Sequence, residues 1–216
     1  MGEKPKLWEG FLFWPGFTDI MVVTLLIFLF LLFAQLTLSS QSWIQAEILR
    51  RQQEIASEVM AALGDEKGLL VIVPDGNLQR FQFSDRLLFN RGEAELLPRG
   101  QDILRRVGEV LYRKASLIKT AQVEGHTDVR PIHTPQFPSN WELSSARATS
   151  VVRFFQDEVG FDPRLLSANG YAEYRPIAEG KSEEVYAKNR RVELVLIYST
   201  VNSIQGNPMP REDTQH

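Results

Sequence analysis

The sequence contains no cysteine among its 216 residues and only three histidines. The absence of cysteine excludes disulfides, thiolate zinc sites and cysteine nucleophiles within the chain. Basic residues are not in surplus either, because the formal net charge is −3. Nucleic-acid-binding domains usually carry a basic patch, so nucleic acid is not an expected partner. No nucleophilic triad and no catalytic pair of carboxylates can be recognised, and we expect neither an enzyme nor a cofactor.

Long apolar runs are also scarce, and the one that is present covers residues 16–38, GFTDIMVVTLLIFLFLLFAQLTL. Crossing a bilayer takes roughly 20 apolar residues, so this run predicts a transmembrane helix. It is longer than the core of a signal peptide and no small-residue cleavage site follows it, which favours an uncleaved anchor. Lys4 and Lys6 precede the run, and the next basic residue is Arg50. The positive-inside rule then places residues 1–15 in the cytoplasm and the main domain outside the inner membrane.

Asp19 lies inside this apolar run. An ionised carboxylate at membrane depth costs about 3 kcal/mol or more, and such groups usually serve ion or proton pathways. The alternative is a first-turn acid at the headgroup level, which the helix dipole would favour. The apolar residues 11–14 extend the run upstream and support the deeper position. Asp19 is therefore our candidate proton carrier.

Residues 39–68 read as a polar linker helix. Ile48, Ile55 and Ala62 recur every seven residues, with Val59 between them, and so form a weak heptad seam. Two interpretations remain open. The segment is either a solvated linker or a short helix that dimerises or covers a pore.

Residues 69–199 are long enough for one domain of about 130 residues. Asp75-Gly76-Asn77 predicts the turn of a hairpin. Because strands and helices alternate, the expected fold is α/β, an α+β sandwich with a mixed sheet covered on one face by helices. The tail, residues 200–216, is polar and expected to be disordered. The predicted strands are 69–73, 78–83, 117–124 and 191–199, and the predicted helices are 98–115 and 139–158, with an irregular stretch after 166–171.

Three sequence blocks carry a family resemblance. They are Glu124–Asp128 (EGHTD), Ser139–Ala148 (SNWELSSARA), and Gly170-Tyr171 followed by Pro176 and Asn189–Glu193 (NRRVE). In this order they resemble the OmpA-like peptidoglycan-binding domain over about residues 69–199. The second block, and the longer loop 129–139 before it, look most like the MotB version found in flagellar motors. MotB proteins also have one N-terminal membrane helix with an aspartate near its start, which matches Asp19.

The chemistry of the ligand agrees with two of these residues. Many peptidoglycan stem peptides carry diaminopimelate, whose free end has one ammonium and one carboxylate. Arg147 can bind the carboxylate through its fork, and Asp128 can accept from the ammonium. The resemblance implies these same roles for Asp128 and Arg147, with Thr127, Asn140, Leu143 and Ser144 as supporting contacts.

Each of these residues also has a purely structural interpretation. Asp128 could cap a turn, and Arg147 could pair with Glu142 or Asp157. His126 and Asp128 are too few to form a metal site, and His126 is expected to hydrogen-bond within the strand-to-loop turn. Of Arg190 and Arg191, one is expected either to close the pocket or to make a structural salt bridge.

The resemblance implies a motor subunit. Two copies of the chain would sit within a MotA-like pentamer, pass protons or sodium ions through Asp19, and hold the peptidoglycan with their outer domains. Two alternatives stay open. One is a passive wall tether without ion transport, and the other is a motor of the same build in a phage-defence complex of the Zorya type.

Overall fold

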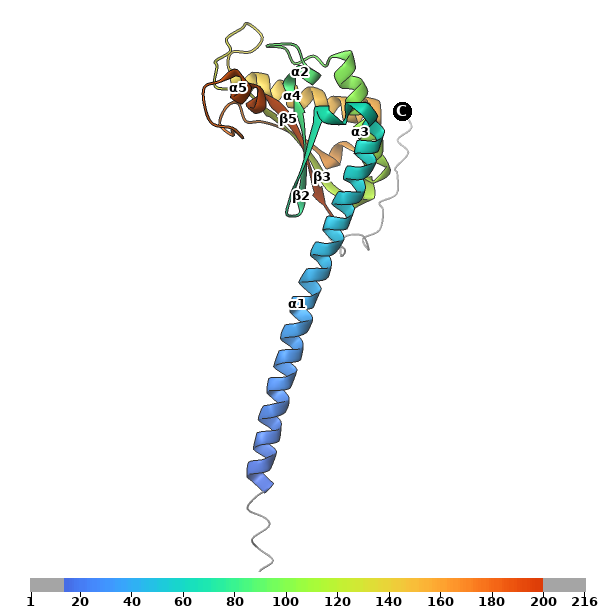
Figure 1. Ribbon diagram of the computed structural model, residues 1–216, viewed down its shortest axis with the longest axis vertical. Coiled ribbons are helices and arrows are strands. Elements are labelled where there is room, and N and C mark those ends of the chain that lie inside the picture. The colour runs from blue at the N-terminus through green and yellow to red at the C-terminus, as the bar shows by residue number, and fades with distance from the viewer. Residues whose placement is uncertain (1–13, 200–216) are drawn as a thin grey trace, which may run out of the picture. The chain divides into compact units, whose positions relative to one another are not determined.

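The computed structural model describes residues 14–199, so the interpretations of residues 1–13 and of the tail 200–216 lie outside the described residues. By its internal contacts the chain divides into two units, Met1–Ala46 and Glu47–His216. The helix α1 (Trp14–Leu63) supplies the described part of the first unit and the beginning of the second. Figure 1 shows the course of the chain.

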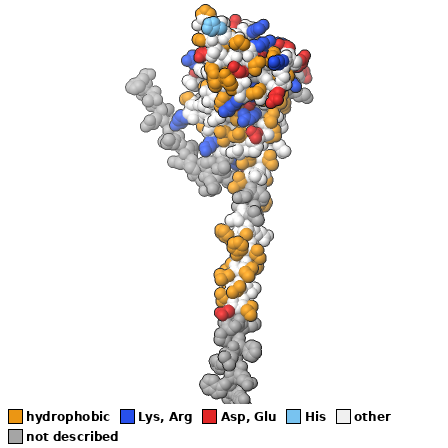
Figure 2. Space-filling view, turned by 90° about the vertical axis from the view of Figure 1, so that its left-hand side faces the viewer, with side chains coloured by type: hydrophobic (Ala, Val, Ile, Leu, Met, Phe, Trp, Pro, Cys, Tyr) orange, Lys and Arg blue, Asp and Glu red, His pale blue; other side chains and the backbone are white. Residues whose placement is uncertain are grey.

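In the first unit, α1 carries the apolar run. Among the described residues, Asp19–Thr37 is the one helical stretch long and apolar enough to cross a membrane, judged by length and composition. Its large hydrophobic side chains are exposed to the surroundings, and Figure 2 shows hydrophobic atoms dominating the visible side of this stretch. A signal sequence near the N-terminus can meet the same criterion of length and composition, so the uncleaved anchor remains a prediction.

The second unit is built on a five-stranded sheet in the order β1-β2-β5-β3-β4. Only β3 and β4 run parallel, and the other neighbours are antiparallel, so the sheet is mixed as expected. The four predicted strands and the hairpin turn at Gly76 are confirmed. The bounds are β1 Leu70–Asp75, β2 Leu78–Ser84, β3 Ile118–His126, β4 Leu166–Gly170 and β5 Arg191–Tyr198.

One face of this sheet forms the core. Phe81 on β2 and Val123 on β3 both lie opposite Leu194 of the central strand, and all three are fully buried. The helix α3 (Pro98–Arg113) covers them, beginning with proline at its first turn. Its predicted apolar stripe is confirmed, because every member is buried: Ile103, Leu104, Val107, Val110 and Leu111.

Two further helical segments complete the layer. The helix α4 (Asn140–Phe154) starts where it was predicted and is followed by a π-helical turn, Phe155–Val159. The C-terminal part of α1 belongs to the same core. The short elements between them are the 3-10 turns Gly64–Leu69, Ala115–Leu117 and Pro163–Leu165 and the helices α2 (Asp85–Leu88) and α5 (Glu183–Asn189).

Three of the four apolar heptad positions of α1 do not form a free surface, whereas the fourth, Ala62, is exposed. Ile48 is 9% exposed, Ile55 and Val59 are fully buried, and all three belong to the core of their own domain. The Gln52 amide donates to the carbonyl oxygens of Gly76 and Leu78, which fastens the helix to the hairpin. Ile48, Ile55 and Val59 are therefore neither solvated nor available as a dimer seam, and a role of the helix in covering a pore stays a prediction. A helix face packed on its own domain produces the same spacing.

Candidate functional site

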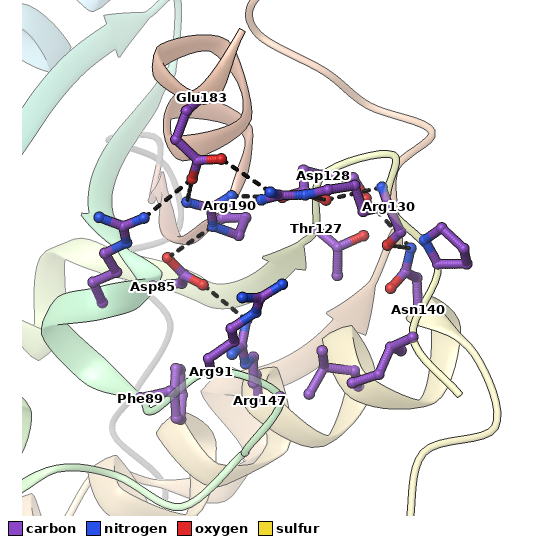
Figure 3. Close-up of a pocket in the computed structure, with 15 residues that line it drawn as sticks. Asp85, Phe89, Arg91, Thr127, Asp128, Arg130, Asn140, Arg147, Glu183 and Arg190 are labelled. Atoms are coloured by element: carbon purple, nitrogen blue, oxygen red, sulfur yellow. Dashed lines mark hydrogen bonds and ion pairs between the residues drawn. The ribbon is translucent and has the colours of Figure 1, made fainter. Parts of the chain in front are cut away.

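A pocket of about 590 Å³ opens where several loops meet (Figure 3). Its walls come from α2 and the turn after it, the end of β3, the loop 129–139, the first two turns of α4, and the α5–β5 connection. The lining residues are Asp85, Arg86, Phe89, Arg91, Gly92, Thr127, Asp128, Arg130, Pro131, Ile132, Asn140, Leu143, Arg147, Glu183 and Arg190.

Five of the six predicted wall-binding residues line this pocket: Thr127, Asp128, Asn140, Leu143 and Arg147. Ser144 does not. It is fully buried, donates to the Trp141 carbonyl oxygen and accepts from the backbone N–H of Ala172. Ala172 in turn accepts from the N–H of Thr127. Ser144 therefore helps to position the Thr127 backbone and does not line the pocket, so its expected role as a supporting contact stays a prediction.

Two glycines bring α4 close enough to the sheet to place these side chains. A Cβ at Gly125 would lie 2.2 Å from the Ser144 carbonyl oxygen, and one at Gly170 would lie 2.2 Å from Oγ of Ser145. No side chain fits such distances. The glycines of the EGHTD block and of the Gly-Tyr pair are thus explained by helix packing. Ser139 caps α4 by accepting from the N–H of Trp141.

Arg147 is 2% exposed and holds the floor of the pocket. Its Nε donates to the Glu93 carbonyl oxygen (2.8 Å), Nη2 to that of Asn90 (3.1 Å), and Nη1 to the Asp85 carboxylate (3.3 Å). Burial lowers the pKa of Arg147 although Asp85 opposes the shift, and burial raises the pKa of Asp85. The ion pair expected with Glu142 or Asp157 is instead made with Asp85. Arginine has five N–H donors, so donors remain for a ligand.

Asp128 lies at the opposite side of the pocket and already has partners. Its Oδ1 accepts from the backbone N–H of Arg130 (2.9 Å), so it does cap a turn. Its Oδ2 also accepts from Nη2 of Arg130 and Nη1 of Arg190, each at 2.5 Å. Burial opposes ionisation, but these hydrogen bonds outweigh it and hold the pKa of Asp128 below its usual value. A ligand ammonium must therefore compete with arginine for this carboxylate.

The pocket as a whole carries a surplus of positive charge. Five arginines and three carboxylates line it, with no lysine or histidine among the lining residues. Glu183 is shared by three of the arginines, Arg86, Arg130 and Arg190, at 3.1, 2.9 and 2.8 Å. The arrangement favours anionic ligands, and carboxylates in particular, because guanidinium groups match them in geometry.

Comparison with known proteins identifies the domain that holds this pocket. Residues 88–190 match the model of the OmpA family. This segment is an OmpA-family domain. The match covers all of the pocket residues except Asp85 and Arg86, which stand just before it.

Individual relatives share this OmpA-family domain. YtxE, an uncharacterised protein of Bacillus subtilis, is 35% identical over 67% of this chain and 54% of its own length. Motility protein B of the same organism is 32% identical over 52% of this chain and 42% of its own. The crystal structure of a MotB-like protein from Desulfovibrio vulgaris has a TM-score of 0.65 at 29% identity and covers 72% of this chain and 99% of that one. The chain thus spans about half the length of these curated relatives, and the expected resemblance is confirmed.

The opposite face of the OmpA-family sheet carries a second polar cluster. Ligand atoms of Glu124, His126 and Glu193 lie within 4.8 Å of one another, a juxtaposition that the sequence analysis missed. Arg80 pairs with both carboxylates (3.3 and 3.0 Å), and Arg191 pairs with Glu193 (2.5 Å). The two carboxylates are therefore neutralised by arginine.

His126 itself behaves differently from the expectation. Neither ring nitrogen has a hydrogen-bond partner in the described part of the chain, and the ring stacks on Tyr171 with centroids 5.4 Å apart. Burial lowers the pKa of His126, which the nearby Glu124 offsets only in part. The two neighbouring arginines lie in different places. Arg190 lines the pocket, whereas Arg191 lies in the cluster with Glu193.

Sequence reasoning missed four lining residues outside the loop 129–139 that matter for the charge of the pocket. Asp85, Arg86, Arg91 and Glu183 stand outside the three recognised blocks and reach the pocket only through the fold. Arg130 and Ile132 confirm that the loop 129–139 borders the site. An arginine two residues after Asp128 was the one available signal, because this spacing permits a side chain to fold back onto the carboxylate.

Proposed function

We propose that this chain is a MotB-type subunit of an ion-driven motor, anchored in the inner membrane and holding peptidoglycan with its OmpA-family domain. The observation that carries the proposal is the joint placement of Thr127, Asp128, Asn140 and Arg147 around one pocket. The similarity to motility protein B supports the motor assignment, and the apolar stretch Asp19–Thr37 supports the anchor.

In this proposal the pocket binds the diaminopimelate of a stem peptide. The remaining N–H donors of Arg147 bind the carboxylate of diaminopimelate, aided by the N-terminal end of α4. Its ammonium replaces Arg130 on Asp128, which is feasible because the Arg130 side chain is 41% exposed. Thr127 supports this assignment, since its buried Oγ1 has no hydrogen-bond partner among the described residues. Asn140 and Leu143 complete the wall around the stem.

The membrane part of the proposal assigns ion transport to Asp19. Two copies of α1 pass through a ring formed by a MotA-like pentamer, with their N-termini in the cytoplasm. Protons, or sodium ions, bind Asp19 from the outer side and leave inward. The peptidoglycan contact then holds the chain in place while the ring moves. Asp19 supports this role as the one charged residue in its stretch.

Cosedimentation with purified sacculi tests the wall site. The full chain in detergent should sediment with sacculi, and Asp128→Asn and Arg147→Lys should each lower its affinity about ten- to hundredfold. Charge-assisted hydrogen bonds contribute roughly 1.5–3 kcal/mol, which corresponds to that range. Both substitutions conserve size or charge, so that the protein remains folded.

The matched control is Asp157→Asn, which removes an equal charge from an exposed acid outside the pocket. It should bind as the wild type does. Circular dichroism and a thermal melt check that each variant is folded. Wild-type sedimentation of both pocket variants would show that the assigned site is wrong.

A further inference from the structure

Arg91 is the one lining arginine whose side chain has no polar partner within residues 14–199. The other four lining arginines each pair with Asp85, Asp128 or Glu183. Arg91 makes no ion pair and no hydrogen bond from its side chain within residues 14–199, although it faces the same pocket (Figure 3). The positive surplus of the pocket therefore includes the charge of Arg91, which no described carboxylate balances.

The backbone around Arg91 is fixed by the pocket itself. Arg147 donates to the carbonyl oxygens of Asn90 and Glu93, which flank Arg91 on both sides. The Asn90 side chain also donates to the Glu93 carboxylate at 3.0 Å. Gly92 adopts a φ of 72°, and a Cβ there would meet Ile132 of the neighbouring loop at 3.4 Å. The turn that presents Arg91 is thus built into the site and is not a loose surface loop.

This position matches the chemistry of a carboxylate. A guanidinium presents a planar fork that binds both carboxylate oxygens, and an unpaired guanidinium in a pocket lining is a ready partner for an anionic ligand. If the ligand carried a carboxamide in place of this carboxylate, its uncharged NH₂ group would face the N–H donors of the guanidinium. Such a mismatch rejects a ligand more strongly than the loss of one contact alone.

We infer that Arg91 is a second ligand-binding arginine, and that the pocket selects stem peptides whose diaminopimelate carries free carboxylates over those in which it is amidated. The inference rests on the proposed function, because it assumes that the stem peptide is the ligand. The inference adds Arg91, which lies outside the recognised motifs, to the ligand-binding residues. It also adds a preference for peptidoglycan with free diaminopimelate carboxylates over the amidated form.

Isothermal titration of the full chain in detergent tests the inference with two synthetic peptides. One is L-Ala-γ-D-Glu-meso-diaminopimelate, and the other is the same tripeptide with the free-end carboxyl of diaminopimelate converted to an amide. The wild type should bind the carboxylate form about tenfold more tightly, as expected for one charge-assisted contact. Arg91→Gln should lose this preference by weakening the binding of the carboxylate form alone.

The control is Arg153→Gln on α4, which removes the same charge from another exposed arginine outside the pocket and should keep the preference. Equal affinity of the wild type for both peptides would overturn the inference and leave the proposed function standing. A preference retained by Arg91→Gln would also overturn it. Failure of the wild type to bind either peptide would overturn the proposed function and the inference together.

Discussion

Arg147 serves the fold and the site at the same time. It neutralises the buried Asp85 and holds the carbonyl oxygens of Asn90 and Glu93. Removing one member of a buried ion pair leaves an uncompensated charge, which typically costs 3–5 kcal/mol, or roughly a third or more of a domain's stability. An alanine substitution at Arg147 would therefore confuse unfolding with loss of binding, which is why the lysine variant is the better test.

His126 makes the stability of the domain depend on pH. The unfolded chain takes up a proton near pH 6.5, whereas the buried ring has a lowered pKa and takes it up only at more acidic pH. The unfolded state thus binds more protons as the pH falls below that value, and stability decreases. We expect the melting temperature to drop between about pH 7.5 and 5.5 in the wild type, and to change less in His126→Gln.

The exposed His133 provides the matched control, because His133→Gln should retain the wild-type pH dependence. Asp128 and Glu183 have lowered pKa values, so their stabilisation is lost only at more acidic pH and does not obscure this window. Differential scanning calorimetry at several pH values makes the measurement. An unchanged pH dependence in His126→Gln would contradict the assignment.

At this scale the sequence predicts best where residues lie within a motif. Thr127, Asp128, Asn140, Leu143 and Arg147 reached the pocket as expected because their blocks fix the β3–loop–α4 geometry. Arg91 and Glu183 were not predictable, since they stand outside the three blocks and reach the pocket only through the fold. The sequence also suggested nearby partners for Arg147, whereas the true one, Asp85, lies 62 residues away.

Among the elements, α1 shows how one spacing permits two structures. The positions Ile48, Ile55 and Val59 repeat as a coiled-coil seam does, yet they pack on the domain that follows them. Hydrophobic spacing identifies a buried face but does not say whether the cover is a second chain or the same one. The Gln52 bonds to the hairpin decide it here.

If the proposed dimer pairs through α1, it uses the outward face of that helix, because the other face packs on its own domain. Leu49 is 51% exposed, and Gln53 follows four residues later on the exposed side. Because the chain has no native cysteine, single cysteines at Leu49 and Gln53 should cross-link as homodimers in membranes under oxidation. A cysteine at the buried Ile55 should give none. Absence of cross-linking at every exposed position along residues 47–63 would count against the dimer.

Short elements were the least predictable from sequence. The strand β4 reads LSANG, which lacks the alternation of large apolar residues, and it is recognised only through its parallel pairing with β3. The helix α5 has seven residues and one cap, Ser182. Long periodic segments such as α3 were predicted correctly because their pattern extends over several turns.

Across the whole molecule, the two units divide the work that the proposal requires. The apolar stretch of α1 carries a single carboxylate, and the OmpA-family domain carries an arginine-rich pocket. The mixed sheet and its one helical layer were predictable because strand and helix patterns alternate along residues 69–199. The proposed ion transport depends on a partner ring, and no composition or spacing in this chain specifies that ring.

Measuring ion flux through Asp19 tests whether the chain is a motor subunit or a passive tether. The chain is co-expressed with a MotA-like protein, and proton or sodium uptake is measured in membrane vesicles with ion-sensitive dyes. The account predicts flux for the wild type and for the control Asp157→Asn, reduced flux for Asp19→Glu, and none for Asp19→Asn. Equal flux in the wild type and Asp19→Asn would contradict it and leave the chain a passive tether.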